Sequence, residues 1–220
     1  MPQIPLFPLG TVLMPGARLQ LRIFEPRYLT MLRDLIRDPE DVRRFGVVAI
    51  RAGVEVGTDQ ATDLYGVGCS AVLERLAPMD DSTYGLVARG QRRFSLDAVD
   101  SSAGTLYPTA DITWLAERTG NSDRVQSSAR RLRTLLVDYW RVLGVGDLTA
   151  DDLDQDPHLL SYQVDEVMVL DVGDRHRLLA AETTEERLSV ALRLLRRETE
   201  LVSQLGAVPH RPDRGPTNLN

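Results

Sequence analysis

The first half of the chain alternates apolar and polar residues in short runs, which is the pattern of half-buried β-strands. Leu19, Leu21 and Ile23 alternate in this way with polar residues. A helix is expected to begin at Pro26, where the missing N–H of proline costs nothing, and to end before Asp38. Further strands are expected at residues 45–50, 64–78, 83–96 and 107–115, with a turn at 79–82 and a bulge or bend at Gly90.

A further strand is expected at the start of the chain, where prolines at positions 2, 5 and 8 alternate with large apolar residues. Proline has no N–H to donate to a ladder, so it does not belong in a central strand. We therefore expect the segment Ile4–Leu9 to lie along a sheet edge. In the helix that follows, one apolar face is expected to be formed by Tyr28, Leu29, Leu32, Leu35 and Ile36.

The second half has helical spacing instead. Ser122 is expected to cap a helix that runs to Leu143 and ends at Gly144, and Asp156-Pro157 to start another that includes Leu159. A short helix is expected at 175–181, and the last helix is expected to begin with the capping box of residues 183–186. Its apolar face includes Leu194, Leu201 and Leu205, and the first and last helices are predicted to pack together through their apolar stripes.

Composition restricts the compartment and the chemistry. The chain has 220 residues and one cysteine, Cys69, which excludes an internal disulfide and is typical of the reducing cytoplasm. No apolar run is long enough for a membrane span, and no signal peptide is expected. All 26 basic residues are arginine. Because there is no lysine, the chain cannot supply a phosphate-loop lysine, a Schiff base or a serine–lysine dyad.

Four segments together resemble a known family. These are the opening Ile4–Leu9 with Ile23–Tyr28, then Tyr65–Gly68, Gly85–Phe94 and the strand 107–115. The sequences of these segments resemble those of the N-terminal, substrate-binding domain of Lon proteases. The resemblance implies an α+β fold: a PUA-like β pseudo-barrel with one helix over residues 1–117, then an α-helical bundle over 118–206. Residues 207–220 are expected to form a disordered tail. The resemblance is to the stand-alone bacterial members, which lack the ATPase and peptidase domains.

Two short motifs suggest ligands, but their context does not support them. Residues 66–71 match a dinucleotide fingerprint, yet they are expected to form a strand, and no acidic residue follows at the required distance. Residues 152–156 carry the alternating carboxylates of a calcium loop. However, Pro157 and Gln163 stand where glycine and glutamate are needed. Asp156 is instead expected to cap the helix that Pro157 begins. We predict neither a cofactor nor a metal.

No catalytic residues are predicted. His158, His176 and His210 have no metal-ligand spacing, and Ser70 lacks the glycine that a nucleophile elbow needs two residues later. Cys69 lies on an apolar strand, where a cysteine is more typical of the core than of a reactive site.

RNA binding is the alternative function, because PUA-like folds often bind RNA. Arg18, Arg22, Arg27, Arg89, Arg92 and Arg93 would supply the cationic residues. Against this, residues 1–118 carry 13 arginines and 15 acidic residues, and residues 119–206 carry 11 and 16. Phosphate binding favours a net basic surface, whereas these arginines can pair with local carboxylates such as Glu25.

The sequence therefore predicts a non-catalytic module that binds a protein or peptide. Its partner is expected to be unfolded or extended polypeptide, or a protein partner, and a homodimer stays open. The first strand and the seam between the two parts are the surfaces to consider, since an apolar groove or a free sheet edge accepts extended chains. The sequence assigns no individual substrate-binding residue.

Overall fold

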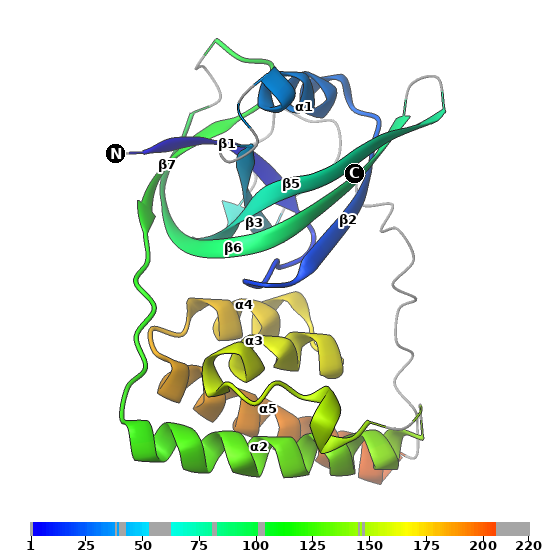
Figure 1. Cartoon of the computed structure of the whole chain (residues 1–220), viewed down its shortest axis with the longest axis vertical. Coiled ribbons are helices and arrows are strands. Elements are labelled where there is room, and N and C mark those ends of the chain that lie inside the picture. Colours follow the sequence, from blue (N-terminus) through cyan, green and yellow to red (C-terminus); the bar gives the residue numbers. More distant parts are fainter. Residues whose placement is uncertain are drawn as a thin grey trace. The chain divides into compact units, whose positions relative to one another are not determined.

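The computed structural model describes residues 2–37, 39, 43–52, 63–80, 83–100, 104–144, 146 and 148–205. The chain divides into two compact units, with one boundary between Ala116 and Glu117. The described part of the first unit holds a large sheet and one helix, and that of the second is helical (Figure 1). The chain is thus a mixed α/β protein. No helix in the described ranges is long and apolar enough to span a membrane.

The strands of the first unit form a ladder that closes on itself. They are β1 (Gln3–Leu9), β2 (Arg18–Ile23), β3 (Arg44–Ala52), β4 (Asp63–Leu64), β5 (Val67–Asp80), β6 (Thr83–Asp100) and β7 (Thr109–Trp114). The main path runs β1-β7-β6-β5-β3-β4, with β2 paired to β6. Because β1 also pairs in parallel with β3, five strands form a ring.

The strand β1 is not an edge strand, so that prediction was wrong. It pairs with β7 over residues 3–5 and with β3 over residues 6–9. The Leu6 N–H donates to the Pro108 carbonyl on the β7 side. Backbone N–H directions alternate along a strand, so the nitrogen of Pro8 also points toward β7, but the pairing with β7 ends at residue 5. The nitrogen of Pro5 points toward β3, but the pairing with β3 begins only at residue 6. Neither proline therefore removes a ladder hydrogen bond.

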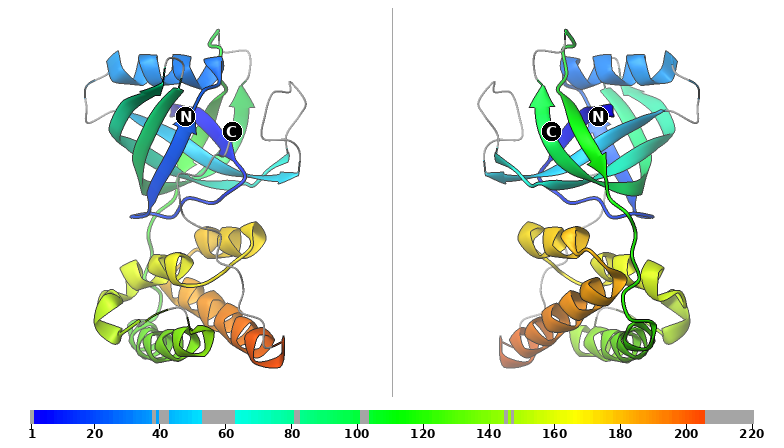
Figure 2. Two further views of the ribbon diagram at one scale, coloured as in Figure 1. Left: turned by 90° about the vertical axis from the view of Figure 1, so that its right-hand side faces the viewer. Right: turned by 90° about the vertical axis from the view of Figure 1, so that its left-hand side faces the viewer.

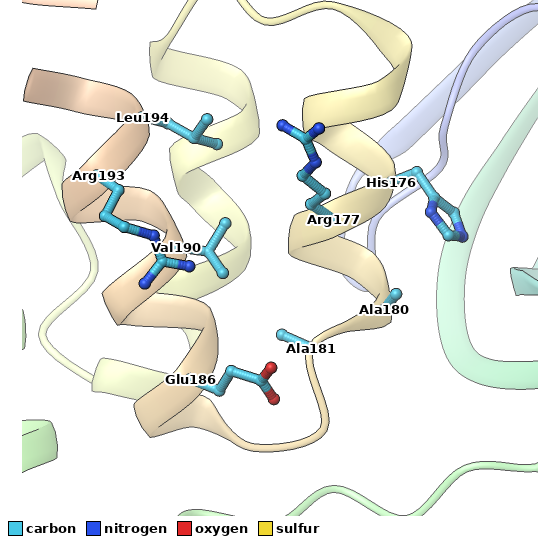
Figure 3. A pocket seen from close by; sticks show the side chains of 8 residues that line it. All are labelled: His176, Arg177, Ala180, Ala181, Glu186, Val190, Arg193 and Leu194. Carbon is cyan, nitrogen blue, oxygen red and sulfur yellow. The ribbon is translucent and has the colours of Figure 1, made fainter. Parts of the chain in front are cut away.

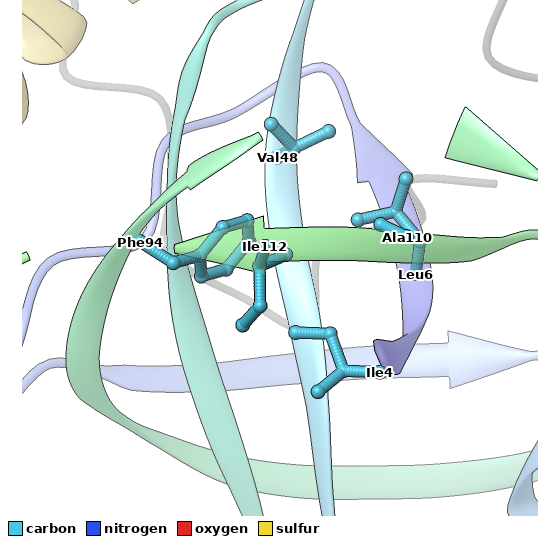
Figure 4. Packing of buried hydrophobic residues seen from close by; sticks show 6 residues of the cluster. All are labelled: Ile4, Leu6, Val48, Phe94, Ala110 and Ile112. Carbon is cyan, nitrogen blue, oxygen red and sulfur yellow. The ribbon is translucent and has the colours of Figure 1, made fainter. Parts of the chain in front are cut away.

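A compact apolar cluster fills the space inside the ring (Figure 4). It is formed by Ile4, Leu6, Val48, Phe94, Ala110 and Ile112. The Phe94 ring occupies the space that a Cβ on Gly68 would need. Glycine at this position is thus explained by core packing.

The long strands β5 and β6 form a hairpin whose register shifts at several points. Cys69 pairs with Arg93, but Ala71 pairs with Gly90, so β6 carries one extra residue between these pairs. The bulge predicted at Gly90 is confirmed. Gly90 also exchanges hydrogen bonds with Gly16 and Ala17, and a Cβ there would overlap the Met14 carbonyl oxygen. Glycine is therefore required for this close backbone approach.

The helix α1 (Pro26–Arg37) lies across one end of the sheet (Figure 2). The Tyr28 ring stacks on Phe7 of β1, with 3.9 Å between ring centroids. Met31, Leu32 and Leu35 are buried with it. Ile36 is 42% exposed and does not belong to this buried face, which corrects the prediction. One residue beyond Leu35 turns by about 100° around the helix, which is enough to leave the buried stripe.

The second unit contains α2 (Ser122–Leu143), α3 (Pro157–Val167), α4 (Val172–Ala180) and α5 (Thr184–Leu205), with a short 3-10 turn at Ala150–Asp152. Asn121, not Ser122, caps α2, because its side chain accepts a hydrogen bond from the Arg124 N–H at 3.0 Å. Gly144 ends the helix in the left-handed conformation with φ of 64°, as predicted.

The remaining helix starts follow the sequence closely. Asp156 caps α3 and Pro157 is its first residue, as expected. At the start of α5 the Thr183 hydroxyl accepts from the Glu186 N–H at 3.0 Å. The Glu186 carboxylate accepts from the Glu182 N–H and not from Thr183, so only half of the predicted capping box forms.

The predicted packing of α2 against α5 is confirmed, and this is the most extensive helix pairing of the unit (Figure 1). Buried side chains of α2 include Ala129, Leu132, Leu136 and Tyr139, and those of α5 include Leu188, Ala191 and Leu195. Leu201 is exposed, so its assignment to the apolar face of the last helix was wrong. Leu159 lies in α3 as expected, and its side chain is exposed. The Leu205 side chain and residues 207–220, including His210, lie outside the described residues.

Candidate functional site

The glycine motif at residues 66–71 does not have the strand–turn–helix geometry of a Rossmann nucleotide site. Residues 67–71 belong to β5, and no helix follows them. The Ser70 hydroxyl is buried and accepts a hydrogen bond from the Arg92 N–H at 3.1 Å. The Cys69 thiol is also buried and donates to the Ser70 carbonyl. Both side chains therefore have structural roles.

The acidic run at 152–156 is used for local backbone capping. The Asp152 carboxylate accepts from the Thr149 hydroxyl and N–H, which hold its pKa below the ordinary value. Asp154 accepts from the Asp156 N–H, and Asp156 accepts from the His158 N–H. In the described ranges, no group of three or more histidine, cysteine or acidic residues is arranged to hold a metal ion.

The histidines also lie apart. The His158 ring lies edge-on to Tyr162 and 3.1 Å from the Thr184 hydroxyl, in a polar cluster around the buried Arg187. Arg187 donates to the Leu178 and Ala181 carbonyls and to the Ser161 hydroxyl. These contacts tie α3, α4 and α5 together.

The arginines of the first unit that were considered for RNA binding make different contacts. Arg89 donates to the Glu74 carboxylate at 2.5 Å, and Arg92 stacks on the Trp114 ring. Arg93 is 1% exposed, with a hydrogen bond to the Ala116 carbonyl. Arg27 pairs with Glu25 at 2.8 Å, as the sequence suggested. The strand Arg89–Arg93 therefore does not present three free guanidinium groups to a phosphate backbone.

A groove of about 460 Å³ lies beside the β5–β6 hairpin of the first unit. We call it the edge groove, and it is lined by Ile36, Arg43, Leu73, Glu74, Arg75, Leu76 and Tyr84. Four of these seven residues are apolar or aromatic, and two of them, Ile36 and Tyr84, are 42% and 37% exposed. Exposed apolar side chains gathered in a groove are typical of a binding surface.

A β-bulge explains how consecutive residues of β5 line this groove. Leu73 pairs with Ala88 and Arg75 pairs with Val87, so Glu74 is an extra residue. Leu76 then pairs with Leu86. The extra residue places Leu73 and Leu76 on the same face of the hairpin, although they are three positions apart. The two leucines form a continuous apolar floor with Tyr84.

The rim of the edge groove carries a positive charge that no described carboxylate neutralises. The Arg89 hydrogen bond is the main cause that lowers the pKa of the Glu74 carboxyl, and Arg18, 3.6 Å away, adds to it. Glu74 is thus committed to these two arginines. Arg75 is exposed and has no carboxylate within ion-pair distance among the described residues. Arg43 adds a second guanidinium, which donates to the Ile36 carbonyl at 3.1 Å.

The edge groove is suited to binding and not to bond-making. Its described lining contains no serine, cysteine or histidine, and its one carboxylate is already paired. An apolar floor with cationic groups at the rim can hold an extended chain through its side chains without a fixed reaction geometry.

A second groove, of about 490 Å³, lies between α4 and α5 (Figure 3). Arg177 and Arg193 project into it from the two helices, whereas the His176 ring points away from both. Its apolar residues Ala181, Val190 and Leu194 are already buried. In the edge groove, by contrast, Ile36 and Tyr84 are exposed.

Sequence patterns did not identify the edge groove. Ile36 was assigned to the buried helix face and Tyr84 to the paired strand, and both side chains are exposed. One signal was available in the sequence of β5. Leu73 and Leu76 are both apolar but three residues apart, which breaks the two-residue period of a regular strand and indicates a bulge.

Comparison with known proteins gives a consistent result. The family model described as the ATP-dependent protease La (LON) substrate-binding domain matches residues 3–197. A Lon protease from Anaeromyxobacter dehalogenans is 26% identical over 205 residues, which cover 90% of this chain and 24% of that protein. Lon protease 2 from Herpetosiphon aurantiacus is 28% identical, over 84% of this chain and 23% of that protein. The chain spans about a quarter of the length of these curated relatives.

Solved structures show the same similarity. A Lon N-terminal domain protein from Xanthomonas campestris has a TM-score of 0.64 and 26% identity, with coverage of 88% of this chain and 98% of that one. The N-terminal domain of the Mycobacterium avium complex Lon protease also has a TM-score of 0.64, at 16% identity, over 90% of this chain and 98% of that one. The fold described above is therefore that of Lon N-terminal domains, and the chain belongs to the LON substrate-binding domain family.

Proposed function

We propose that this chain is a non-catalytic module that binds unfolded or extended polypeptide, and that the edge groove is its contact surface. The observation that carries the proposal is the exposure of Ile36 and Tyr84 beside the leucine floor. Membership of a substrate-binding family supports the same function. The chain binds without cleaving, since a phosphate-loop lysine and a serine–lysine dyad are both excluded by its composition.

An apolar floor suits a partner that is defined by being unfolded. Unfolded chains expose apolar side chains that native proteins bury, and a groove that recognises them needs little sequence specificity. The charged residues at the rim limit self-association of the protein through this groove when no ligand is bound. This combination is what a selector of unfolded chains requires.

We further propose that residues 1–117 form a PUA-like pseudo-barrel and residues 118–206 a helical bundle. Support comes from the ring of strand pairings and from the packing of α2 against α5. On this view the barrel carries the polypeptide site.

The experiment measures binding of a reduced, carboxymethylated protein by fluorescence anisotropy. An Ile36→Ser/Tyr84→Ser double variant is compared with Leu106→Ser, because Leu106 is 72% exposed, lies in the same unit and does not line the groove. Loss of roughly 60–80 Å² of apolar contact, at about 25 cal/mol per Å², weakens binding by about 10- to 30-fold. Leu106→Ser should bind like the parent. Equal affinity of parent and double variant would refute the proposed site.

A parallel titration with structured RNA separates the alternative function. RNA affinity falls steeply with salt because counterions are released, whereas apolar binding changes little or strengthens. Salt-sensitive RNA binding without any binding of unfolded protein would overturn the proposal.

A further inference from the structure

In the described part of the chain, one edge of β5 has no partner strand where the edge groove lies. On one side β5 pairs with β6 along its length, from Val67 to Asp80. On the other side it pairs with β3 only as far as Val72. Among the residues that the structure describes, no strand pairs with the outer edge of β5 beyond this point. Among these residues, the backbone on that side of β5 has no strand partner in the groove.

The direction of the backbone groups can be worked out from two neighbours. The Leu73 N–H donates to the Arg43 carbonyl at 3.1 Å, on the side away from β6. Pro78 keeps its place in the ladder opposite Tyr84 without an N–H, which is suited to a nitrogen that faces outward. By alternation Leu76 faces the same way as Pro78. The bulge at Glu74 accounts for Leu73 and Leu76 sharing this side.

We propose that the edge groove takes its polypeptide as an added β-strand along the outer edge of β5. This inference rests on the proposed function and specifies how the chain is held. The Leu76 N–H, the Leu76 carbonyl and the Pro78 carbonyl pair with the backbone of the bound segment. Alternate side chains of that segment lie on the floor of Leu73, Leu76 and Tyr84. Backbone pairing explains how one site accepts many sequences.

The rim specifies the chemistry of the bound segment further. Arg75 is the rim group without a carboxylate partner among the described residues, and Glu74 is held by Arg89 and Arg18. An acidic side chain next to an apolar one therefore complements the groove. The favoured partner is an extended, apolar segment that carries an aspartate or glutamate.

The site is short, because the edge has limits at both ends. The Leu73 N–H is already used by Arg43, and Pro78 offers no donor. The bound segment thus exchanges about three hydrogen bonds and needs about four or five residues in extended conformation. Short pairing of this kind gives weak, reversible binding, which suits sampling of many chains.

The test uses a labelled eight-residue peptide that alternates valine and threonine, with one aspartate at a threonine position. A set of variants carries a single N-methyl group at each successive amide. Strand addition requires a two-residue period: methylation of amides that face β5 weakens binding about tenfold or more, and methylation of the intervening amides leaves it unchanged. Binding of the carboxymethylated protein is measured in the same samples.

The outcomes separate this inference from the proposed function. If the carboxymethylated protein binds but the peptide does not, or N-methylation has no period, strand addition is wrong and polypeptide binding still stands. If neither ligand binds, the proposed function is wrong as well. Arg75→Glu should weaken the aspartate peptide several-fold but not its asparagine analogue. Arg33→Glu is the control, since Arg33 is exposed in the same unit and outside the groove. Equal effects of both substitutions would refute the role of Arg75.

Discussion

The contact between α2 and α5 can be tested by a matched pair of leucines in the second unit. Leu136 of α2 is 0% exposed, and Leu201 of α5 is 43% exposed. We expect Leu136→Ala to destabilise the protein by about 2–5 kcal/mol. Leu201→Ala should cost less than about 1 kcal/mol.

The size of the effect follows from burial. Truncation of a leucine to alanine removes three carbon groups, each worth about 0.8 kcal/mol when fully buried. The cavity left between two long helices adds to this loss, because the backbone cannot collapse fully into the space. The Leu201 side chain is already partly in contact with water, so its truncation to alanine removes only part of the hydrophobic free energy of a buried leucine.

Urea unfolding followed by far-UV circular dichroism measures both variants, since most of the described helix lies in the second unit. With a slope of about 2 kcal/mol per molar, a loss of about 3 kcal/mol lowers the midpoint by about 1.5 M. The slopes of parent and variants should agree. A loss below about 1 kcal/mol for Leu136→Ala, or equal losses for the two leucines, would show that this helix contact is wrongly assigned.

Three further outcomes are expected. Gly90→Ala should cost about 1–3 kcal/mol in urea melts because its Cβ overlaps the Met14 carbonyl, whereas Gly66→Ala, with open space around it, should be nearly neutral. Arg187→Met should cost about 3–5 kcal/mol, because the Leu178 and Ala181 carbonyls then lose their buried donor. Since the folded-state pKa of Glu74 is lowered, its contribution is present above the unfolded pKa of about 4.3 and is lost as pH falls through the folded value. With Glu74→Gln, the free energy of unfolding should therefore fall slightly less steeply as the pH is lowered, and urea melts at a series of pH values would detect this difference.

Local signals in the sequence were strong enough to predict most elements. Helix starts at Pro26 and Pro157 and the end of α2 at Gly144 depend on backbone chemistry of one or two residues. The bulge at Gly90 was predictable for the same reason. These features are decided within a few residues, so no knowledge of the fold is needed.

The failures share a different cause. The position of β1 between β3 and β7 depends on which partner each half of the strand meets, and the prolines restrict only the N–H groups. The exposure of Ile36 depends on what packs beside the last turn of α1. Both are decided by residues distant in sequence. The edge groove depends on such long-range contacts throughout, and so it could not be assigned from sequence patterns.

An open sheet edge also requires protection against pairing with other copies of the chain. Native proteins limit such pairing with prolines, charged residues and bulges at the edge. The outer edge of β5 has all three, in Pro78, Arg75 and the bulge at Glu74. Two copies that paired here would bring their Arg75 side chains together, which like-charge repulsion disfavours. A segment with an acidic residue meets no such penalty. The same residues that protect the edge from self-association therefore select the chemistry of the chain that we propose it binds.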